Sequence, residues 1–346
     1  MPFFRFKATV AAVALLSASS AFAQEKVLNL YSARHYQTDE ALYENFTKKT
    51  GIKINRIEAD DSALLERLKN EGKNSPADVI LMVDAARLWR AEIDGLFQPV
   101  KSKILTSRIP ENLRGKDAGS GSQWYGFSNR ARFIVYNKDK VNKEDVATYE
   151  LLADPKNKGK VCTRSGSHPY MLSLIGSMIE RNGEKATEEW ARGVVNNFAR
   201  PPKGGDTDQI KGVASGECSI ALSNSYYYAR LMRSDKAADK EIVSKTAVVW
   251  PNQSGAGTHV NISGGAVAKN APHPEAAVKF LEYLASDEAQ TYFANGNNEW
   301  PVVASVDPKN PALKELGKFK AEKMPISVIG MNQIKAQKIL DRVGYK

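Results

Sequence analysis

The chain carries the run Asn224-Ser225-Tyr226-Tyr227-Tyr228-Ala229-Arg230. Three consecutive tyrosines suit a protein core poorly, because successive side chains of a helix point about 100° apart. The preceding residues 218–222 read as a short buried strand, and residues 223–225 supply side chains that cap helices. The tyrosines therefore lie where a strand ends and a helix begins, which is the ligand-binding edge of open α/β sheets. An aromatic surface patch or a sugar-stacking platform is the alternative, but three tyrosines at such a junction favour a ligand site.

The first 23 residues have the order of a secretory signal peptide. Arg5 and Lys7 precede a mostly apolar run over residues 8–16, and small residues then lead to Ala-Phe-Ala at 21–23 before Gln24. The apolar run is too short to span a bilayer, and the A-x-A ending is typical of a cleavage site. We expect the mature, exported chain to begin near Gln24.

Length and charge limit the class of protein. Removing 23 of the 346 residues leaves 323, which suits two domains of ordinary size. The leader contains two basic residues and no acidic one, so its removal lowers the formal net charge from +10 to +8. Apart from short pairs such as Lys48-Lys49, basic residues alternate with acidic ones, which indicates a solvated surface and no nucleic-acid partner.

Cys162 and Cys218 are the two cysteines of the sequence. An even pair in an exported protein predicts a disulfide, although two free buried thiols are the alternative. Closing a loop of this length would contribute about 4 kcal/mol in the chain-entropy model. The bridge would tie the segment before Tyr170 to the strand before Tyr226.

Strands and helices alternate in the first part of the mature chain. Strands are predicted at residues 27–31, 52–57 and 76–82, and helices are predicted to begin at Thr38 and near Asp61 and Asp84. This β-α-β-α-β order predicts a parallel, doubly wound sheet with right-handed crossovers. Later strands are expected within residues 124–136, 161–164, 218–222, 246–250 and 264–268.

Common catalytic motifs are missing from the sequence. It has no Walker loop, no H-E-x-x-H, C-x-x-C or G-x-S-x-G motif, and no dinucleotide-binding glycine motif. Of the four histidines, His273 is expected in a turn, and His168 and His259 in polar loops. His35 differs because it adjoins Tyr36 at the end of the first strand. We expect a binding protein and not an enzyme.

Tyrosines at strand ends are the most informative chemical feature. Tyr36, Tyr170 and the run at 226–228 all follow predicted strands. Phenolate is a hard, anionic ligand that suits Fe³⁺ better than zinc or copper. Because a free phenol has a pKa of about 10, the metal must displace its proton, and Fe³⁺ is acidic enough to do so. Several phenolates would over-neutralise the ion, and five arginines beside these loops can balance that charge: Arg34, Arg130, Arg132, Arg164 and Arg230.

Five further stretches accompany the tyrosine run. They are residues 30–36 (LYSARHY), 75–79 (SPADV), 161–165 (VCTRS), 216–221 (GECSIA) and 298–302 (NEWPV). Together, over nearly the whole mature chain, they resemble the periplasmic ferric-ion-binding proteins, the iron(III) solute-binding components of ABC importers. The resemblance implies an α/β, two-lobed periplasmic-binding-protein fold (type II, transferrin-like) with a hinge and an interlobe cleft. The first lobe is expected to comprise residues 27–130 plus 257–305, and the second residues 131–256 plus 306–346.

The resemblance also implies a set of metal ligands. Tyr226 and Tyr227 match the paired iron tyrosines of the family. Tyr36 and Tyr170 match the additional tyrosines of a branch that binds iron without an accompanying anion. Tyr228 falls at a position that relatives need not use for the metal, so we expect it to lie outside the site.

His35 matches a ligand of another branch, which uses a His, a Glu and two Tyr. The acidic ligand of that branch would fall near Val83 or Asp84. Valine cannot bind the metal, and Asp84 occupies a helix-start position, so the tyrosine-rich set is favoured. His35 remains a candidate ligand beside the four tyrosines.

As the resemblance implies, we expect a periplasmic monomer that binds Fe³⁺ and delivers it to an inner-membrane ABC permease for iron uptake. One alternative is a protein of the same fold that binds an organic or phosphate-bearing anion, which the arginines would serve. A second is an Fe³⁺ dioxygenase with Tyr and His ligands, which would need two histidines where only His35 is well placed. A third is a protein that sequesters iron without a transporter.

Overall fold

The structure of the protein is a computed structural model that describes residues 26–34, 36, 38–117 and 119–346. The expected signal peptide and the candidate ligand His35 lie outside the described residues. Among the helices that are described, none has the length and apolar character needed to cross a membrane.

In the described part of the chain, ten strands form one continuous, mixed sheet, in the order β2-β1-β3-β9-β5-β7-β6, with β4 paired to β9 and both β8 and β10 paired to β5. The strands are β1 (Val27–Ser32), β2 (Lys53–Glu58), β3 (Val79–Met82), β4 (Phe97–Gln98), β5 (Tyr125–Asn137), β6 (Val161–Cys162), β7 (Ile220–Asn224), β8 (Thr246–Val249), β9 (Val260–Ala268) and β10 (Trp300–Pro301). β1 pairs in parallel with β2 and β3, which confirms the arrangement predicted from the β-α-β order. β9 and β5 run antiparallel to their neighbours, which that local order does not predict.

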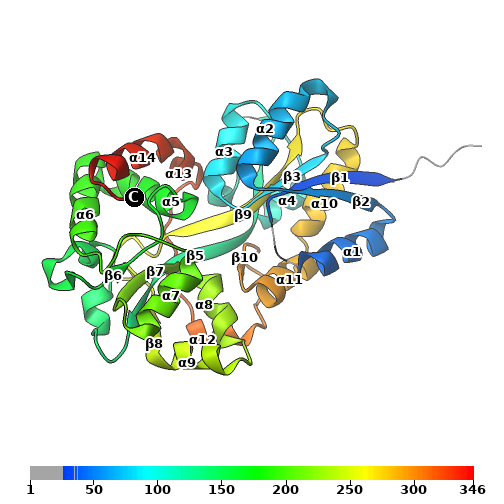
Figure 1. Ribbon diagram of the computed structural model, residues 1–346. Coiled ribbons are helices and arrows are strands. Elements are labelled where there is room, and N and C mark those ends of the chain that lie inside the picture. The colour runs from blue at the N-terminus through cyan, green and yellow to red at the C-terminus, as the bar shows by residue number, and fades with distance from the viewer. Residues whose placement is uncertain (1–25, 35, 37, 118) are drawn as a thin grey trace, which may run out of the picture.

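Fourteen α-helices cover the described part of this sheet (Figure 1). They are α1 (Asp39–Thr50), α2 (Asp61–Glu71), α3 (Ala85–Ile93), α4 (Lys103–Arg108), α5 (Pro169–Asn182), α6 (Glu184–Asn196), α7 (Asp206–Ser215), α8 (Ser225–Met232), α9 (Ala237–Lys245), α10 (Pro274–Leu284), α11 (Asp287–Asn297), α12 (Pro311–Leu316), α13 (Ser327–Met331) and α14 (Gln333–Arg342). Gly51 ends α1 in the left-handed conformation with φ 70°, as its sequence position predicted. The expected side-chain cap by Thr38 does not form, because its hydroxyl contacts Asn297 instead.

Buried apolar side chains gather in separate cores on the two sides of the molecule. Leu28, Phe46, Leu88 and Phe280 belong to the first core, and we call the part of the chain around it the first lobe. In the second lobe, β5 alternates between two clusters, with Ile134 facing one and its neighbours facing the other. The two clusters include Leu174, Ile175 and Trp190 on one face, and Phe133, Val135 and Ile210 on the other.

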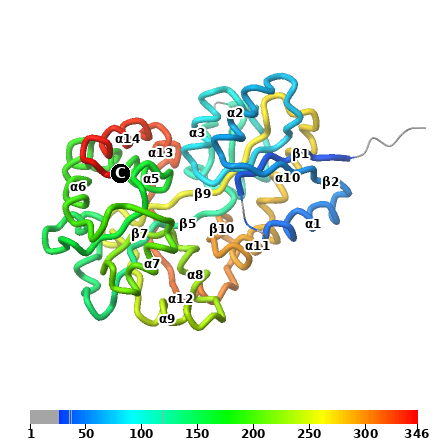
Figure 2. The backbone as a smooth tube through the Cα atoms, in the orientation of Figure 1, coloured from blue at the N-terminus to red at the C-terminus, as the bar shows by residue number. Residues whose placement is uncertain are grey.

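Two strands link the lobes. Residues 125–131 of β5 pair with β9, whereas residues 132–137 pair with β7 and β8 of the second lobe. In Figures 1 and 2, β5 and β9 run side by side through the middle of the molecule. We propose that they form the hinge, and that the lobes follow the boundaries expected from the sequence except in the C-terminal part of the chain. The C-terminal part of the chain contributes to both lobes. Ile326 and Ile329 join the first core, and Ala336 and Ile339 of α14 join the second.

Candidate metal centre

Four tyrosines from separate parts of the chain meet where the lobes face each other. Tyr36 follows β1 of the first lobe, Tyr170 lies in the first turn of α5, and Tyr226 and Tyr227 lie in the first turn of α8. The hydroxyl oxygens of Tyr170 and Tyr226 are 3.1 Å apart. The ring of Tyr226 lies 6.1 Å from that of Tyr36 and 4.2 Å from that of Tyr227, centre to centre. The structure therefore brings together the four tyrosines that the sequence singled out.

The local sequence fixes the position of Tyr170. Pro169 occupies the first position of α5, where its missing N–H leaves no bond unmade. His168 caps the helix, because its Nδ1 accepts a hydrogen bond of 3.1 Å from the backbone N–H of Tyr170. The two rings also meet edge to face at 4.5 Å. Burial, together with the charges of Arg164 and Arg132, lowers the pKa of His168 to about 3, so the imidazole is neutral at physiological pH.

α8 begins differently from the sequence-based prediction. β7 extends through Asn224, so the strand runs directly into the helix that carries the tyrosines. The expected side-chain cap does not form, because the Asn224 side-chain oxygen accepts a hydrogen bond of 2.9 Å from Arg132. The buried Arg132 thus binds the side-chain oxygen of Asn224 that was expected to cap α8.

Burial favours the protonated phenols of Tyr36, Tyr170 and Tyr226 when no cation is present. Burial raises the pKa of Tyr226, and the neighbouring Tyr170 and Tyr36 raise it further. Burial likewise raises the pKa of Tyr170, although the positive charge of Arg130 opposes the increase. For Tyr36, burial and then the carboxylate of Glu299 raise the pKa. A ligand that takes these oxygens as phenolates must therefore carry a high positive charge.

All five predicted arginines lie beside the tyrosines. The distances from guanidinium carbon to ring centre are 4.8 Å for Arg34 and Tyr36, 4.9 Å for Arg164 and Tyr170, 5.9 Å for Arg130 and Tyr170, 6.0 Å for Arg132 and Tyr170, and 5.4 Å for Arg230 and Tyr227. Arg132 and Arg164 both pair with the buried Asp206, at 3.0 and 3.2 Å. Their charges are therefore partly compensated inside the second lobe.

Arg130 is held differently. It is 1% exposed, and its Nη1 donates to Ser263 at 2.9 Å. Its Nε and Nη2 have no hydrogen-bond partner among the described residues, and no carboxylate there lies within ion-pair distance of it. Because a buried guanidinium needs compensation, Arg130 leaves positive charge available at the tyrosine site.

Glu299 is a member of the site that the sequence analysis missed. Its side chain is fully buried and accepts hydrogen bonds from Ser128 at 2.7 Å and from Tyr36 at 3.3 Å. It also lies 3.5 Å from Arg34. The carboxylate therefore compensates Arg34 and holds the hydroxyl of Tyr36. The sequence signal available for Glu299 was its place in the stretch NEWPV, because a single glutamate forms no recognisable motif by itself.

Comparison with known proteins identifies the family. The pattern described as bacterial extracellular solute-binding protein matches residues 41–321. The chain is 50% identical to iron uptake protein A1 of Synechocystis sp., over 93% of this chain and 88% of that protein. The chain belongs to the bacterial extracellular solute-binding protein family.

Solved structures agree with this assignment. A Trichodesmium protein in complex with iron and citrate ligands is 54% identical, with a TM-score of 0.87 over 92% of this chain and 100% of that one. The ferric binding protein of Campylobacter jejuni is 40% identical, with a TM-score of 0.86 and the same coverage. These relatives confirm the predicted resemblance to periplasmic ferric-ion-binding proteins and the predicted two-lobed, transferrin-like fold.

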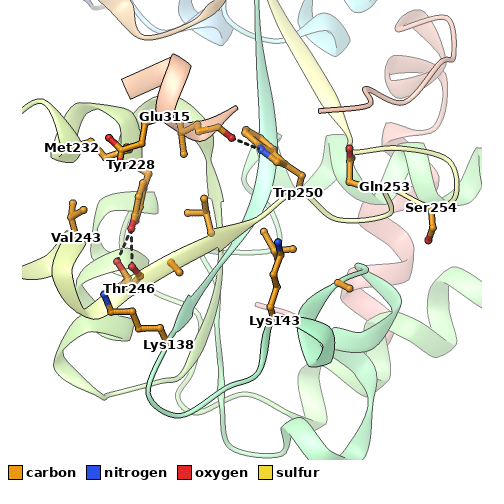
Figure 3. Close-up of a pocket in the computed structure, with 15 residues that line it drawn as sticks. Lys138, Lys143, Tyr228, Met232, Val243, Thr246, Trp250, Gln253, Ser254 and Glu315 are labelled. Carbon is orange, nitrogen blue, oxygen red and sulfur yellow. Dashed lines mark hydrogen bonds between the residues drawn. The ribbon is translucent and has the colours of Figure 1, made fainter. Parts of the chain in front are cut away.

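In this solute-binding protein, Tyr228 points away from the other tyrosines. Its hydroxyl lies 3.1 Å from both the carbonyl oxygen and the hydroxyl of Thr246. It lines a separate cavity of about 700 Å³, which also contains Trp250 and Lys143 (Figure 3). Two successive steps of 100° along a helix explain why Tyr226 and Tyr228 face opposite ways.

The predicted disulfide is confirmed. Cys162 of β6 and Cys218, just before β7, are joined, with their Cα atoms 5.9 Å apart. β6 and β7 also pair in parallel, with Cys162 opposite Ala221. The bridge therefore fastens together the segments that lead to Tyr170 and to Tyr226.

In the branch that uses a His, a Glu and two Tyr, the acidic ligand would fall near Val83 or Asp84. Neither residue offers a free carboxylate here. Val83 is buried, and Asp84 uses both oxygens in hydrogen bonds to the protein. Within residues 26–34, 36, 38–117 and 119–346, no group of three or more His, Cys, Asp and Glu side chains could hold a metal.

Proposed function

We propose that this protein binds Fe³⁺ between its lobes through the phenolates of Tyr36, Tyr170, Tyr226 and Tyr227. The observation that carries the proposal is the meeting of the four rings, with two hydroxyl oxygens 3.1 Å apart. Hard, anionic oxygen ligands match a small trivalent cation. His35, next to Tyr36 in the sequence, remains a predicted fifth ligand.

The charges of the site support this choice of ligand. Four phenolates would exceed the charge of Fe³⁺ by one, and the buried Arg130 offers a positive charge within the same group of side chains. Arg34, Arg132 and Arg164 are engaged by carboxylates and therefore contribute less. A divalent ion would leave a larger excess of negative charge in a buried site, which costs more free energy.

Relatives support a role in transport rather than in catalysis. Iron uptake protein A1 of Synechocystis sp. is named for iron uptake, and the Trichodesmium structure contains iron. We infer that the protein works in the periplasm and delivers Fe³⁺ to an inner-membrane ABC permease, the partner that the solute-binding family implies.

Metal analysis and visible spectroscopy of the purified protein test the proposal. Apo protein titrated with Fe³⁺, supplied as the nitrilotriacetate chelate, should bind one ion and develop a phenolate-to-iron absorption band. Zn²⁺ should not compete at equal concentration. A protein that stays colourless and retains no iron would contradict the proposed function.

An anion is a second candidate ligand. Arg130 has two unpartnered nitrogens, and Nε of both Arg132 and Arg164 also lacks a partner among the described residues. The Trichodesmium relative holds citrate together with iron. Calorimetry of the apo protein with citrate, with phosphate, and with each in the presence of Fe³⁺ separates the cases. Tight binding of an anion without iron or colour would favour an anion carrier.

A further inference from the structure

A buried carboxylate joins the two lobes beside the tyrosine site. Asp84 is 1% exposed, and its Oδ2 accepts hydrogen bonds from the Ser173 hydroxyl at 2.8 Å and from the Asn261 amide at 2.9 Å. Its Oδ1 caps α3 by accepting from the backbone N–H of Ala86 at 2.8 Å. Asp84 precedes a helix of the first lobe, Ser173 lies in a helix of the second, and Asn261 lies in the linking strand β9.

Close packing continues on the same side of the molecule. α13 contacts both α3 and α5, and Figure 1 shows these three helices next to one another. Gly330 lies so close to Trp89 that a Cβ on it would come within 2.6 Å of that side chain. A Cβ on Gly176 would lie 3.0 Å from the carbonyl oxygen of Ile329. At these two glycines the packing between α3, α13 and α5 therefore leaves no room for a larger side chain.

Ser173 lies one turn after Tyr170 in α5. Residues three apart on a helix are neighbours on one face, so whatever holds Ser173 also sets the position of Tyr170 relative to the first lobe. Tyr36, the tyrosine of the first lobe, must meet Tyr170, Tyr226 and Tyr227 at one point for a single ion to bind all four.

We propose that the Asp84–Ser173 hydrogen bond is an interlobe latch that positions the Tyr170 helix for metal binding. This inference rests on the proposed function and assigns a purpose to an acid that is not a ligand. Removing a hydrogen-bond partner from a buried carboxylate destabilises the arrangement that buries it. The proposal requires that parting of the lobes separates Asp84 from Ser173, so that the bond favours the joined arrangement. A ligand that needs both lobes binds more tightly when that arrangement is already favoured.

The test is Ser173→Ala, with Ser177→Ala as the matched control. Ser177 is one turn further along α5, is equally buried, and donates to the carboxylate of Glu322. Glu322 is also held by Arg181 of the same helix, so this bond does not depend on α3. Each variant removes one hydroxyl that donates to a carboxylate, but only Ser173→Ala removes the bond to Asp84.

Ser173→Ala should bind Fe³⁺ about tenfold more weakly and lose it to a chelator about tenfold faster, the range for one hydrogen bond to a charged group. Its absorption band should keep the wild-type position, because all phenol ligands remain. Ser177→Ala should stay within about twofold of wild type in both measurements. Small-angle scattering of the apo proteins should show a larger radius of gyration for Ser173→Ala than for Ser177→Ala.

Asp84→Asn provides a second variant, since it keeps a side-chain oxygen for the cap of α3 but removes the charge. It should weaken iron binding in the same direction as Ser173→Ala. The latch is refuted if Ser173→Ala and Asp84→Asn both bind and release iron like Ser177→Ala. A wild-type protein that binds no Fe³⁺ would instead refute the proposed function, and the scattering of the apo variants would still decide whether the latch exists.

Discussion

The hydroxyl oxygens of Tyr170 and Tyr226 lie 3.1 Å apart, although the two residues are 56 positions apart in the sequence. Without a cation both phenols keep their protons, and one hydroxyl donates a hydrogen bond to the other. A metal that binds both oxygens must replace that hydrogen bond and release the protons. The pair therefore marks the point where metal binding and protonation compete.

Replacing one of the proposed ligand tyrosines by phenylalanine should abolish or blue-shift the visible band. Tyr170→Phe, Tyr226→Phe and Tyr227→Phe each remove one donor oxygen and keep the ring that packs in the site. Each should weaken Fe³⁺ binding by more than the roughly 10–100-fold that changes to outer-shell partners cost in metal sites. Absorption spectra and competition with a chelator measure both effects.

Tyr228→Phe is the control for these variants. Its hydroxyl bonds to Thr246 on the other side of α8, so the change should cost about 1 kcal/mol of stability and leave the band unchanged. Wild-type colour and affinity in both Tyr226→Phe and Tyr227→Phe would refute the phenolate site. Loss of the band in Tyr228→Phe in place of Tyr226→Phe would shift the paired ligands by one residue.

Iron binding should release protons and weaken in acid. Burial raises the pKa of Tyr36, Tyr170 and Tyr226, so these phenols are protonated near neutral pH before the metal binds. Each proton released makes the affinity fall about tenfold per unit decrease in pH. Titration in weak buffer should show acid release on addition of Fe³⁺, and Tyr226→Phe should release about one proton fewer. Binding without proton uptake or release would contradict phenolate ligation.

The apo protein should also lose stability at alkaline pH, because its buried phenols resist ionisation. The folded-state pKa of these tyrosines is raised above the unfolded value of about 10. Their contribution to stability is therefore complete below pH 10 and declines as the pH rises from there towards the folded pKa. Denaturant unfolding of the apo protein between pH 8 and about 11 should show this decline, and Fe³⁺ should reduce it, because the metal holds the phenols ionised. A stability that stays level across this range would mean that these phenols are not buried.

The tyrosine positions could be predicted because their signals are local. A strand followed by a helix places Tyr226 and Tyr227 at the sheet edge, and Pro169 marks the start of the helix that carries Tyr170. The early β-α-β order likewise gave the parallel pairing of β1 with β2 and β3. Each of these inferences uses residues that are close in the sequence.

The remaining parts of the site depend on contacts between distant residues. Glu299 reaches Tyr36 across 263 positions, and Asp84 reaches Ser173 across 89. The antiparallel pairing of β9 with β3 also joins segments that are far apart in the sequence. No period or motif records such pairings, so a single sequence predicted neither the carboxylate of Glu299 in the site nor the bond between the lobes.

Removal of the disulfide should lower the free energy of unfolding without removing the metal ligands. The bridge closes a loop with a sequence separation of 56, for which the chain-entropy model gives about 4 kcal/mol. The double variant Cys162→Ala and Cys218→Ala should unfold at lower denaturant concentration and still show the iron band at low temperature. Thiol titration of denatured, unreduced wild-type protein should detect no free thiol; two thiols per chain would contradict the bridge.

Fe³⁺ should draw the two lobes together, and Tyr36 should be required for that movement. Tyr36 belongs to the first lobe, whereas Tyr170, Tyr226 and Tyr227 all belong to the second. An ion bound by both sets stabilises the joined arrangement through contacts that an open protein lacks. Small-angle scattering should therefore show a smaller radius of gyration for wild-type protein with Fe³⁺ than without it.

Tyr36→Phe separates binding from closure. The three tyrosines of the second lobe remain, so the variant should still take up Fe³⁺ and show a weaker, shifted band. With the first-lobe phenol gone, the ion no longer bridges the lobes through it, and addition of Fe³⁺ should change the radius of gyration less than in wild-type protein. Tyr228→Phe should close like wild type, because its hydroxyl bonds within the second lobe. If Tyr36→Phe closes as fully as wild type, the bridge between the lobes runs through another group, and Tyr36 is not the ligand that couples iron to closure.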